Sequence, residues 1–446
     1  MRRHSFQFAA ALLILLVATK TRAQSPERNT AQNSPQNSSS ASKIAAVMVS
    51  GTKKVPTDQI ITASGLKLGD AVTQEQIQSA ADHLAALGVF SAVNYRFSSK
   101  GDTIALEFQV QEAPTYPIAF DNFPWFTDEE IAQAVRSQVG LFTGEAPDSG
   151  LLVDAINGTI ENLLSTRKIR GTVTHQLLAQ PVGDGMMMQF RLDAPTLKIQ
   201  SVKFSDALAT NSEMLKDRIP DIRGQPYSRL AIEVFENEHL RPLYASRGYL
   251  RAQVGPPEPR LTSDSSDPAG PGVEILIPVT PGPVYEWDGI SWQGNTALVS
   301  TVLNGAVQLK PGDSADGMRI ESVLQRIESE YTRHGYLDIK MITLPQFDDV
   351  AHRVSYHVTI AEGAQYRMGE MVITGLSVDA EKRLRRAWLL APGQIFDQGY
   401  FEQIAKELAK PSTDIFGEMP IHYTQFGHWL RPNTEAHTVD VLMDFK

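Results

Sequence analysis

The side chains best suited to metal binding and catalysis are spread through the chain without a recognisable site. His352 and His357 lie five residues apart in one expected strand, so their side chains point to opposite faces. His422 and His428 match no metal-ligand spacing, and cysteine is absent. The sequence has no HExxH, GxSxG, phosphate-loop or Rossmann pattern. We therefore predict a protein that is not an enzyme and has no metal, cofactor or small-molecule substrate.

The N-terminus has the order of a secretory signal peptide. Arg2 and Arg3 precede an apolar run at 8–18, and the small residue Ala23 completes a cleavage site. The run is 11 residues long, whereas a membrane-spanning helix needs about 20. We expect residues 1–23 to be a Sec-type signal peptide that is removed after export. An uncleaved N-terminal anchor is the alternative.

The charge balance argues against a nucleic-acid partner. The chain holds 41 basic and 51 acidic residues, a net charge of −10. Removal of residues 1–23 takes away four of the basic residues, which leaves 37 and moves the net charge to −14. A chain of that charge repels phosphate backbones and anionic lipid surfaces. Residues 24–43 contain almost no apolar side chains, so we expect them to form a disordered linker.

Two short patterns recur along the chain at one interval. YASRGYLRAQV at 244–254 and YTRHGYLDIKM at 331–341 share a tyrosine, a glycine and a Tyr-Leu pair in register. A second marker is a glycine turn that precedes a helix, and it recurs at intervals of 75, 80, 88 and 81 residues. The glycines of this turn are Gly69, Gly144, Gly224, Gly312 and Gly393. Two independent markers with one period predict tandem copies of a single unit.

Within each copy the hydrophobic pattern changes in the same order. A short strand is followed by two helices, and a glycine such as Gly248 or Gly335 ends the second helix in the left-handed conformation. Two further strands complete the unit. This order predicts an α+β fold of tandem β-α-α-β-β modules, each a three-stranded mixed sheet covered by two helices. The expected modules are residues 44–113, 114–195, 196–282, 283–363 and 364–446.

These landmarks resemble the POTRA (polypeptide-transport-associated) domains of BamA- and TamA-type outer-membrane assembly proteins. The shared features are a first strand followed by glycine (VMVSGTKKV, ISWQGNTAL, VITGLSV), the Gly-Asp or Gly-Gln turn, and a helix ending in GY or GVF. The second copy departs, because it has Lys168 and Ile169 where others have glycine and an aromatic residue. In that family a membrane β-barrel follows the array. Here one residue follows the last expected strand, 438–445, so we expect a POTRA array without the barrel.

The resemblance places the strand after the second helix at the edge of every sheet. The expected edge strands are Ser91–Phe97, Thr172–Leu178, Leu250–Val254, Asp338–Thr343 and Pro420–Gln425. An exposed edge can accept an added strand through its backbone groups, which is known as β-augmentation. We therefore predict client-strand binding at Val93, Tyr95, Val173, His175, Arg251, Gln253, Ile339, Met341, His422 and Tyr423.

One aromatic stretch has two open interpretations. Residues 120–126 read FDNFPWF and crowd the end of a strand. They brace that strand and the joint with the first module, or Phe123, Trp125 and Phe126 form an exposed patch for a protein partner.

The resemblance implies a non-enzymatic periplasmic scaffold that assists outer-membrane β-barrel protein assembly or secretion and associates peripherally with the outer membrane. The implied partners are unfolded outer-membrane protein clients and a separately encoded outer-membrane β-barrel or assembly subunits. The alternative is a membrane-anchored envelope or cell-division structural protein whose POTRA modules bind other partners.

Overall fold

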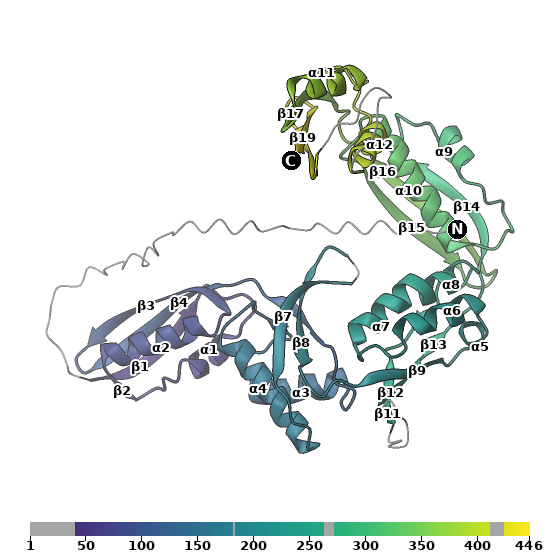
Figure 1. Ribbon diagram of the computed structural model, residues 1–446. Coiled ribbons are helices and arrows are strands. Elements are labelled where there is room, and N and C mark those ends of the chain that lie inside the picture. Colours follow the sequence, from purple (N-terminus) through teal and green to yellow (C-terminus); the bar gives the residue numbers. More distant parts are fainter. Residues whose placement is uncertain (1–40, 182, 263–271, 411–422) are drawn as a thin grey trace.

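Five consecutive sheets, each accompanied by helices, follow one another along a curved array (Figure 1). The computed structural model describes residues 41–181, 183–262, 272–410 and 423–446. The expected signal peptide and nearly all of the expected linker lie outside these residues. A separate two-stranded ribbon accompanies the third sheet.

The first two modules each form a four-stranded sheet. The first comprises β1 (Ser42–Ser50), α1 (Thr57–Ala63), β2 (Ala71–Val72), α2 (Gln74–Ala86), β3 (Phe90–Lys100) and β4 (Thr103–Glu112), in the order β2-β1-β4-β3. The second comprises β5 (Tyr116–Phe120), α3 (Asp128–Gln138), β6 (Glu145–Ala146), α4 (Leu151–Thr166), β7 (Val173–Ala179) and β8 (Met186–Leu192), in the order β6-β5-β8-β7.

The third module has the most divided helix layer. It comprises β9 (Lys198–Phe204), α5 (Ala207–Thr210), α6 (Glu213–Ile222), α7 (Arg229–Phe235), the π-helical η1 (Glu236–Leu240), α8 (Arg241–Ala245), β10 (Gln253–Val254), β11 (Glu258–Thr262), β12 (Gly272–Ile277) and β13 (Val279–Thr280). The main sheet has the order β11-β12-β9, and β10 pairs with β13.

The last two modules have three-stranded sheets. The fourth comprises β14 (Glu286–Gln293), α9 (Ser300–Ala306), α10 (Gly317–Arg333), β15 (Lys340–Asp348) and β16 (Arg353–Ala361), in the order β14-β16-β15. The fifth comprises β17 (Arg367–Thr374), α11 (Val378–Ala387), α12 (Gln398–Leu408), β18 (Phe426–Asn433) and β19 (Thr438–Phe445), in the order β17-β19-β18.

The predicted fold class is confirmed. In every module the first strand pairs in parallel with the last, and the strand between them in sequence pairs antiparallel with the last. Buried apolar side chains from the helices and from one sheet face form the cores. The residue boundaries drawn between modules stay predictions.

The recurring glycine turn covers part of the outer side of the first strand. In the first module the N–H of Gly69 donates to the Ile44 carbonyl at 2.8 Å, and the Ile44 N–H donates to the Asp70 carbonyl at 2.9 Å. The same reciprocal pair recurs in the third, fourth and fifth modules, where the glycines are Gly224, Gly312 and Gly393. In the second module β6 pairs with β5 at this place. The sheet is therefore partly closed on this side.

A second glycine, which directly follows the first strand, has no room for a side chain. Gly51, Gly294 and Gly375 have φ angles of 93°, 84° and 85°. A Cβ at any of them would overlap the carbonyl oxygen near the end of the last strand, which for Gly294 belongs to Ile360. Glycine is needed here both for the left-handed backbone and for the close approach of the two strands.

A glutamate near the end of the last strand holds the loop that follows this glycine. In the first module Glu112 accepts backbone N–H bonds from Lys53 and Lys54, both at 2.7 Å. In the fourth, Glu362 accepts two equivalent N–H bonds, at 2.7 and 2.8 Å. Burial opposes ionisation of Glu112, but the hydrogen bonds from the loop outweigh it and lower its pKa to about 2.

We predict that alanine at Gly294 destabilises the fourth module far more than alanine at Gly312. Both glycines have left-handed backbones, with φ of 84° and 90°, but Gly312 faces open space. Gly312→Ala should cost about 1–2 kcal/mol of unfolding free energy for the backbone alone. Gly294→Ala adds overpacking of about 1–3 kcal/mol. Urea unfolding followed by tryptophan fluorescence measures both, and equal losses would contradict the proposed overlap.

We predict an acid-sensitive contribution to stability from Glu112. Because its folded-state pKa is lowered, the contribution is complete above about pH 4.5 and disappears as the pH falls towards about 2. Glu112→Gln should therefore destabilise the chain at pH 6, and its difference from the wild type should shrink by pH 2.5. Denaturant unfolding across this pH range tests it, with the exposed Glu75→Gln as the matched control.

Candidate partner-binding edges and module joints

The strand that follows the second helix lies at the open edge of its sheet. Within the described residues, β3, β7, β11, β15 and β18 each pair with a single strand. The other side of such a strand presents backbone N–H and C=O groups that can accept a further strand. The array therefore offers five edges of the same kind, one in each module.

In the first two modules the predicted residues lie on these edge strands, with their side chains on the helix side. Val93 and Tyr95 belong to β3 and pack partly buried against the core. Val173 on β7 is buried, and a ring nitrogen of His175 lies 2.9 Å from the Asn157 amide. Their backbones are on the edge, whereas their side chains contribute to packing. Client binding by these residues stays a prediction.

In the third module the predicted edge strand was wrong. Arg251 lies in a turn, and Gln253 lies in β10, which pairs with β13 outside the main sheet. The open edge is β11, which begins at Glu258. Two prolines, Pro256 and Pro257, separate the two strands. Because proline has no backbone N–H, it interrupts the ladder and moves the edge strand along the chain.

In the fourth module the edge strand is β15, and Met341 lies on it opposite Ile360 with its side chain towards the core. Ile339 is buried and precedes the strand, so its assignment to the strand was wrong.

In the fifth module the edge strand is β18, which begins at Phe426, and residues 420–422 of the predicted range lie outside the described residues. Tyr423 precedes the strand, and its hydroxyl donates to the Leu408 carbonyl at the end of α12. This contact ties Tyr423 to the helix end, and two residues later Gln425 exchanges backbone hydrogen bonds with Lys446. The predicted residue His422 lies outside the described residues.

Three exposed apolar side chains on the edge strands of the last two modules were not among the predicted residues. Ile342 and Leu344 on β15 are 61% and 55% exposed, and Trp429 on β18 is 57% exposed. All three lie on the sheet face opposite the helices, as their partners in the register show. The stretch MITL at 341–344 has apolar residues in both phases of the alternation. That signal alone indicates that one apolar set faces outward.

The aromatic stretch at 120–126 is mainly a structural element. Phe123 is fully buried and Phe126 is buried, so the interpretation as an exposed partner patch was wrong for these two residues. Trp125 is half-buried. The stretch also contacts the third module through Arg229, a neighbour not predicted from the sequence, and its bracing of the joint with the first module stays a prediction.

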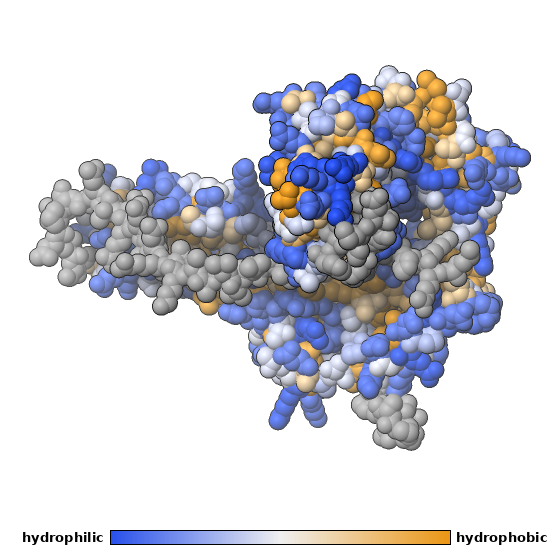
Figure 2. Space-filling model, turned by 45° about the horizontal axis from the view of Figure 1, so that its top comes forward, coloured by the Kyte–Doolittle hydropathy of each residue, from blue (hydrophilic) through white to orange (hydrophobic). Residues whose placement is uncertain are grey.

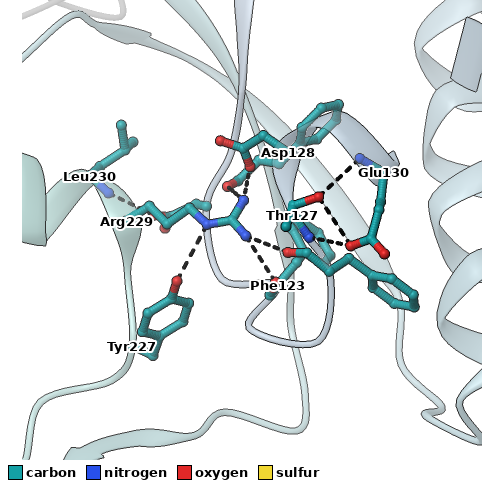
Figure 3. A network of polar contacts seen from close by, with 10 residues as sticks. Phe123, Thr127, Asp128, Glu130, Tyr227, Arg229 and Leu230 are labelled. Carbon is teal, nitrogen blue, oxygen red and sulfur yellow. Dashed lines mark hydrogen bonds and ion pairs between the residues drawn. The ribbon is translucent and has the colours of Figure 1, made fainter. Parts of the chain in front are cut away.

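Arg229 clamps the second module to the third (Figure 3). It comes from the start of α7, and its guanidinium donates to the backbone carbonyls of Phe120, Phe123 and Phe126 at 3.0, 3.1 and 2.6 Å. It also forms an ion pair with Asp128. One planar group thus satisfies several acceptors of a turn that no strand covers. Burial lowers the pKa of Arg229 to about 10, and the nearby carboxylate of Asp121 opposes that shift.

Asp121 completes this joint from the opposite direction. Its carboxylate accepts hydrogen bonds from the Ser228 hydroxyl at 2.7 Å and the Leu230 N–H at 3.1 Å. Its other oxygen accepts from the Gln189 amide at 3.0 Å. Asp121 is buried, so both of its oxygens need these partners. The second and third modules are therefore joined by a polar network that is largely shielded from water.

The repeated Gly-Tyr-Leu pattern also forms joints. The carbonyl of Gly248 accepts the N–H of Tyr285 at 2.9 Å, and the carbonyl of Gly335 accepts the N–H of Tyr366 at 2.7 Å. A Cβ on these glycines would lie 2.9 and 2.6 Å from the carbonyl oxygens of the same two tyrosines. Their φ angles are 81° and 82°, as predicted for a helix end. One glycine therefore ends a helix and seats the next module.

Arg251 belongs to the joint between the third and fourth modules rather than to a client edge. It pairs with Asp349 at 2.8 Å and lies 4.1 Å above the Phe347 ring. The Tyr285 hydroxyl donates to Asp349 at 2.7 Å. The pKa of Asp349 is lowered mostly by this hydrogen bond and next by the hydrogen bond from Arg251. Arg251 is thus used within the chain.

The joint between the second and third modules differs in its helix end as well. Lys168 takes the left-handed conformation there, with φ of 61°, where the first, third and fourth modules have Gly88, Gly248 and Gly335. Lysine has a Cβ, which makes this position unsuited to the close backbone contact that the glycines make. The Arg229 clamp takes the place of that contact.

Within the described residues no group of three or more His, Cys, Asp or Glu side chains is arranged to hold a metal ion. Across the same residues, none of the helices has the length and apolar character required to cross a membrane.

Comparison with known proteins identifies a family for two segments of the chain. The POTRA family, described as a surface antigen variable number repeat, matches residues 42–113 and 285–363. These two segments are POTRA domains, and they are the modules that share the glutamate-held loop. The other three modules repeat the same strand order.

Two curated relatives are outer membrane protein assembly factors named BamA. The protein of Buchnera aphidicola is 18% identical over 84% of this chain and 60% of its own length. The protein of Neisseria meningitidis is 20% identical over 58% of this chain and 33% of its own length. The chain thus spans less than two thirds of either relative. POTRA domains 3–5 of BamA from Haemophilus influenzae overlay with a TM-score of 0.44, at 18% identity over 57% of this chain and 98% of that one.

We predict that Arg229→Lys loosens the joint between the second and third modules. A lysine cannot reach three carbonyls and a carboxylate together, so buried acceptors lose their donors. The loss should be about 3 kcal/mol of unfolding free energy, with a broader distance distribution between spin labels on α4 and α6.

Arg136→Lys is the matched control, because Arg136 forms an exposed ion pair with Glu129 on the same module. It should cost less than about 0.5 kcal/mol and leave the distances unchanged. Equal effects of the two substitutions would show that Arg229 is not a clamp.

Proposed function

We propose that this chain is a non-enzymatic periplasmic scaffold that assists outer-membrane protein assembly or secretion by binding extended client segments at its sheet edges. The observation that supports this best is the recurrence, within the described residues, of an edge strand with one free side in the main sheet of each of the five modules. The names of the curated relatives point to the same process. The signal-like N-terminus supports export, and peripheral association with the outer membrane is part of the proposal.

Backbone pairing suits a scaffold that must handle many sequences. An added strand uses N–H and C=O groups, which every client has, so recognition depends little on side chains. The β15 edge is nine residues long and the β3 edge is eleven. About half of the backbone N–H and C=O groups of an edge strand face outward, and each bond contributes about 1 kcal/mol before ordering costs. A single edge therefore binds weakly, which favours release.

The apolar residues on the outer face of β15 favour client strands that carry apolar side chains at every second position. Ile342 and Leu344 lie two residues apart on one face of β15, next to the free edge. A client strand added at this edge would place every second side chain beside them. Strands of outer-membrane proteins alternate apolar and polar residues, so they fit this arrangement.

The joints give the five edges a common framework. Close contacts at glycine join the fourth module to the third and the fifth to the fourth, and the Arg229 clamp joins the third to the second. Edges held on one array raise the effective concentration of each edge for a client that is already bound at another. Several weak contacts then act together, provided that one client segment can reach more than one edge.

We predict that an unfolded outer-membrane protein crosslinks to the edge strand and not to the centre of the sheet. A photo-crosslinking residue placed at Leu344 on β15 should capture a urea-denatured outer-membrane protein upon dilution. The same residue at His357 is the control, because His357 lies directly opposite on the central strand β16.

A client strand beside β15 is separated from β16 by the width of one strand, so capture at His357 should be several-fold lower. Equal capture at both positions, or capture of the folded outer-membrane protein as well, would contradict binding by strand addition.

A further inference from the structure

The surface of helix α11 has a charge opposite to that of the chain as a whole. The chain has a net charge of −10. Within α11, Val378–Ala387, four residues are cationic and two are acidic, and the cations are Lys382, Arg383, Arg385 and Arg386. Figure 1 shows α11 on the outer rim of the fifth module, at one end of the array. None of the edges or joints described above uses this surface.

One face of α11 is buried in the module and the opposite face is exposed. Leu384 is fully buried in the core of the module. At about 100° per residue, Lys382 and Arg386 lie on the side opposite Leu384, and both are exposed. Arg385 is used within the module, because it pairs with Glu381 at 2.8 Å and donates to the Met371 carbonyl at 3.0 Å. Among the described residues, no ion pair includes Lys382 or Arg386.

Exposed aliphatic side chains precede and follow these two cations along the chain. Val378, one turn before Lys382 on the same face, is 67% exposed, and Leu389, just beyond the helix end, is 73% exposed. The "α11 face" denotes Val378, Lys382, Arg386 and Leu389 together. Asp379 in the first turn is the one acidic residue on this side. In Figure 2, hydrophobic residues stand among hydrophilic ones over the part of the molecule that comes forward from the top of Figure 1.

We infer that the α11 face binds the surface of an anionic phospholipid membrane. Lys382 and Arg386 match the negative headgroups in charge, and Val378 and Leu389 can enter the boundary of the acyl chains. A convex helix face with cations between aliphatic residues fits a flat surface better than it fits an extended peptide, which needs a groove or an edge.

The remainder of the chain determines how such contact would orient the molecule. Because the chain is acidic overall, its other surfaces are repelled by anionic headgroups. The fifth module would touch the membrane, and the other modules would extend away from it with their edges accessible. This inference goes beyond the proposed function and does not depend on client binding.

The test is flotation of the full chain with phosphatidylcholine vesicles that do or do not contain phosphatidylglycerol. We expect binding only to the vesicles with phosphatidylglycerol, and a marked loss at roughly 0.5 M salt, where surface charges are screened. The double substitution Lys382→Gln with Arg386→Gln should weaken binding roughly thirtyfold. Val378→Ser with Leu389→Ser should weaken it as well, because the aliphatic contact is lost.

The matched control is Lys67→Gln with Lys100→Gln, which removes two exposed cations from the first module and should leave vesicle binding unchanged. Circular dichroism and edge crosslinking at Leu344 report whether each variant keeps its fold and its client edge. Equal binding to both vesicle types, no effect of the α11 substitutions, or an equal loss in the control pair would each overturn the inference. A failure of client crosslinking alone would overturn the proposed function and leave this inference standing.

Discussion

The parallel pairing of the first and last strands is the interaction on which the rest of the structure depends. It recurs in all five described sheets and places the last strand at the centre. The strand before it in sequence must then occupy the edge. In the first, fourth and fifth modules, the glycine after the first strand permits this pairing to continue to its end, because the backbones approach too closely for a Cβ. A backbone constraint thus produces the surface that we propose to bind clients.

The joints between modules follow two different physical designs. Gly248 and Gly335 form close backbone contacts that exclude any side chain, so these joints depend on shape. The joint at Arg229 depends on a partly buried cation that contacts three carbonyl oxygens and the Asp128 carboxylate, with the Asp121 carboxylate nearby. Shape-based contacts are insensitive to salt and pH, whereas a charged clamp has a desolvation cost that its partners must offset. The joints of the array therefore differ in how strongly salt and pH affect them.

The repeat period and the turn glycines were enough to predict the fold class, because each glycine marks a backbone requirement that other residues do not meet. The edge positions were harder. Two prolines moved the edge strand in the third module, and in the fifth Tyr423 is tied to the end of α12 ahead of the strand. Both effects depend on tertiary contacts or on breaks inside a strand, which periodicity does not report. Alternation alone also could not distinguish Met341, which faces inward, from Ile342, which faces outward.

Composition also did not predict where on the folded chain the positive charges gather. The net charge of the chain predicts repulsion from anionic surfaces, yet the four cations of α11 share one short helix with exposed aliphatic residues. An average over 446 residues hides such a local reversal. The positions of charged residues on a folded helix are what decide which surfaces meet.

The glycine turn that covers the first strand has a consequence for self-association. A sheet with two open edges can grow by the addition of strands from other molecules on both sides, as fibrils do. Here the turn of each module partly covers one edge of its main sheet. Each module therefore has one open edge that could pair with a strand of another molecule. Two sheets that pair in this way leave no open edge between them, so the pairing of any one module stops at two sheets instead of extending strand on strand.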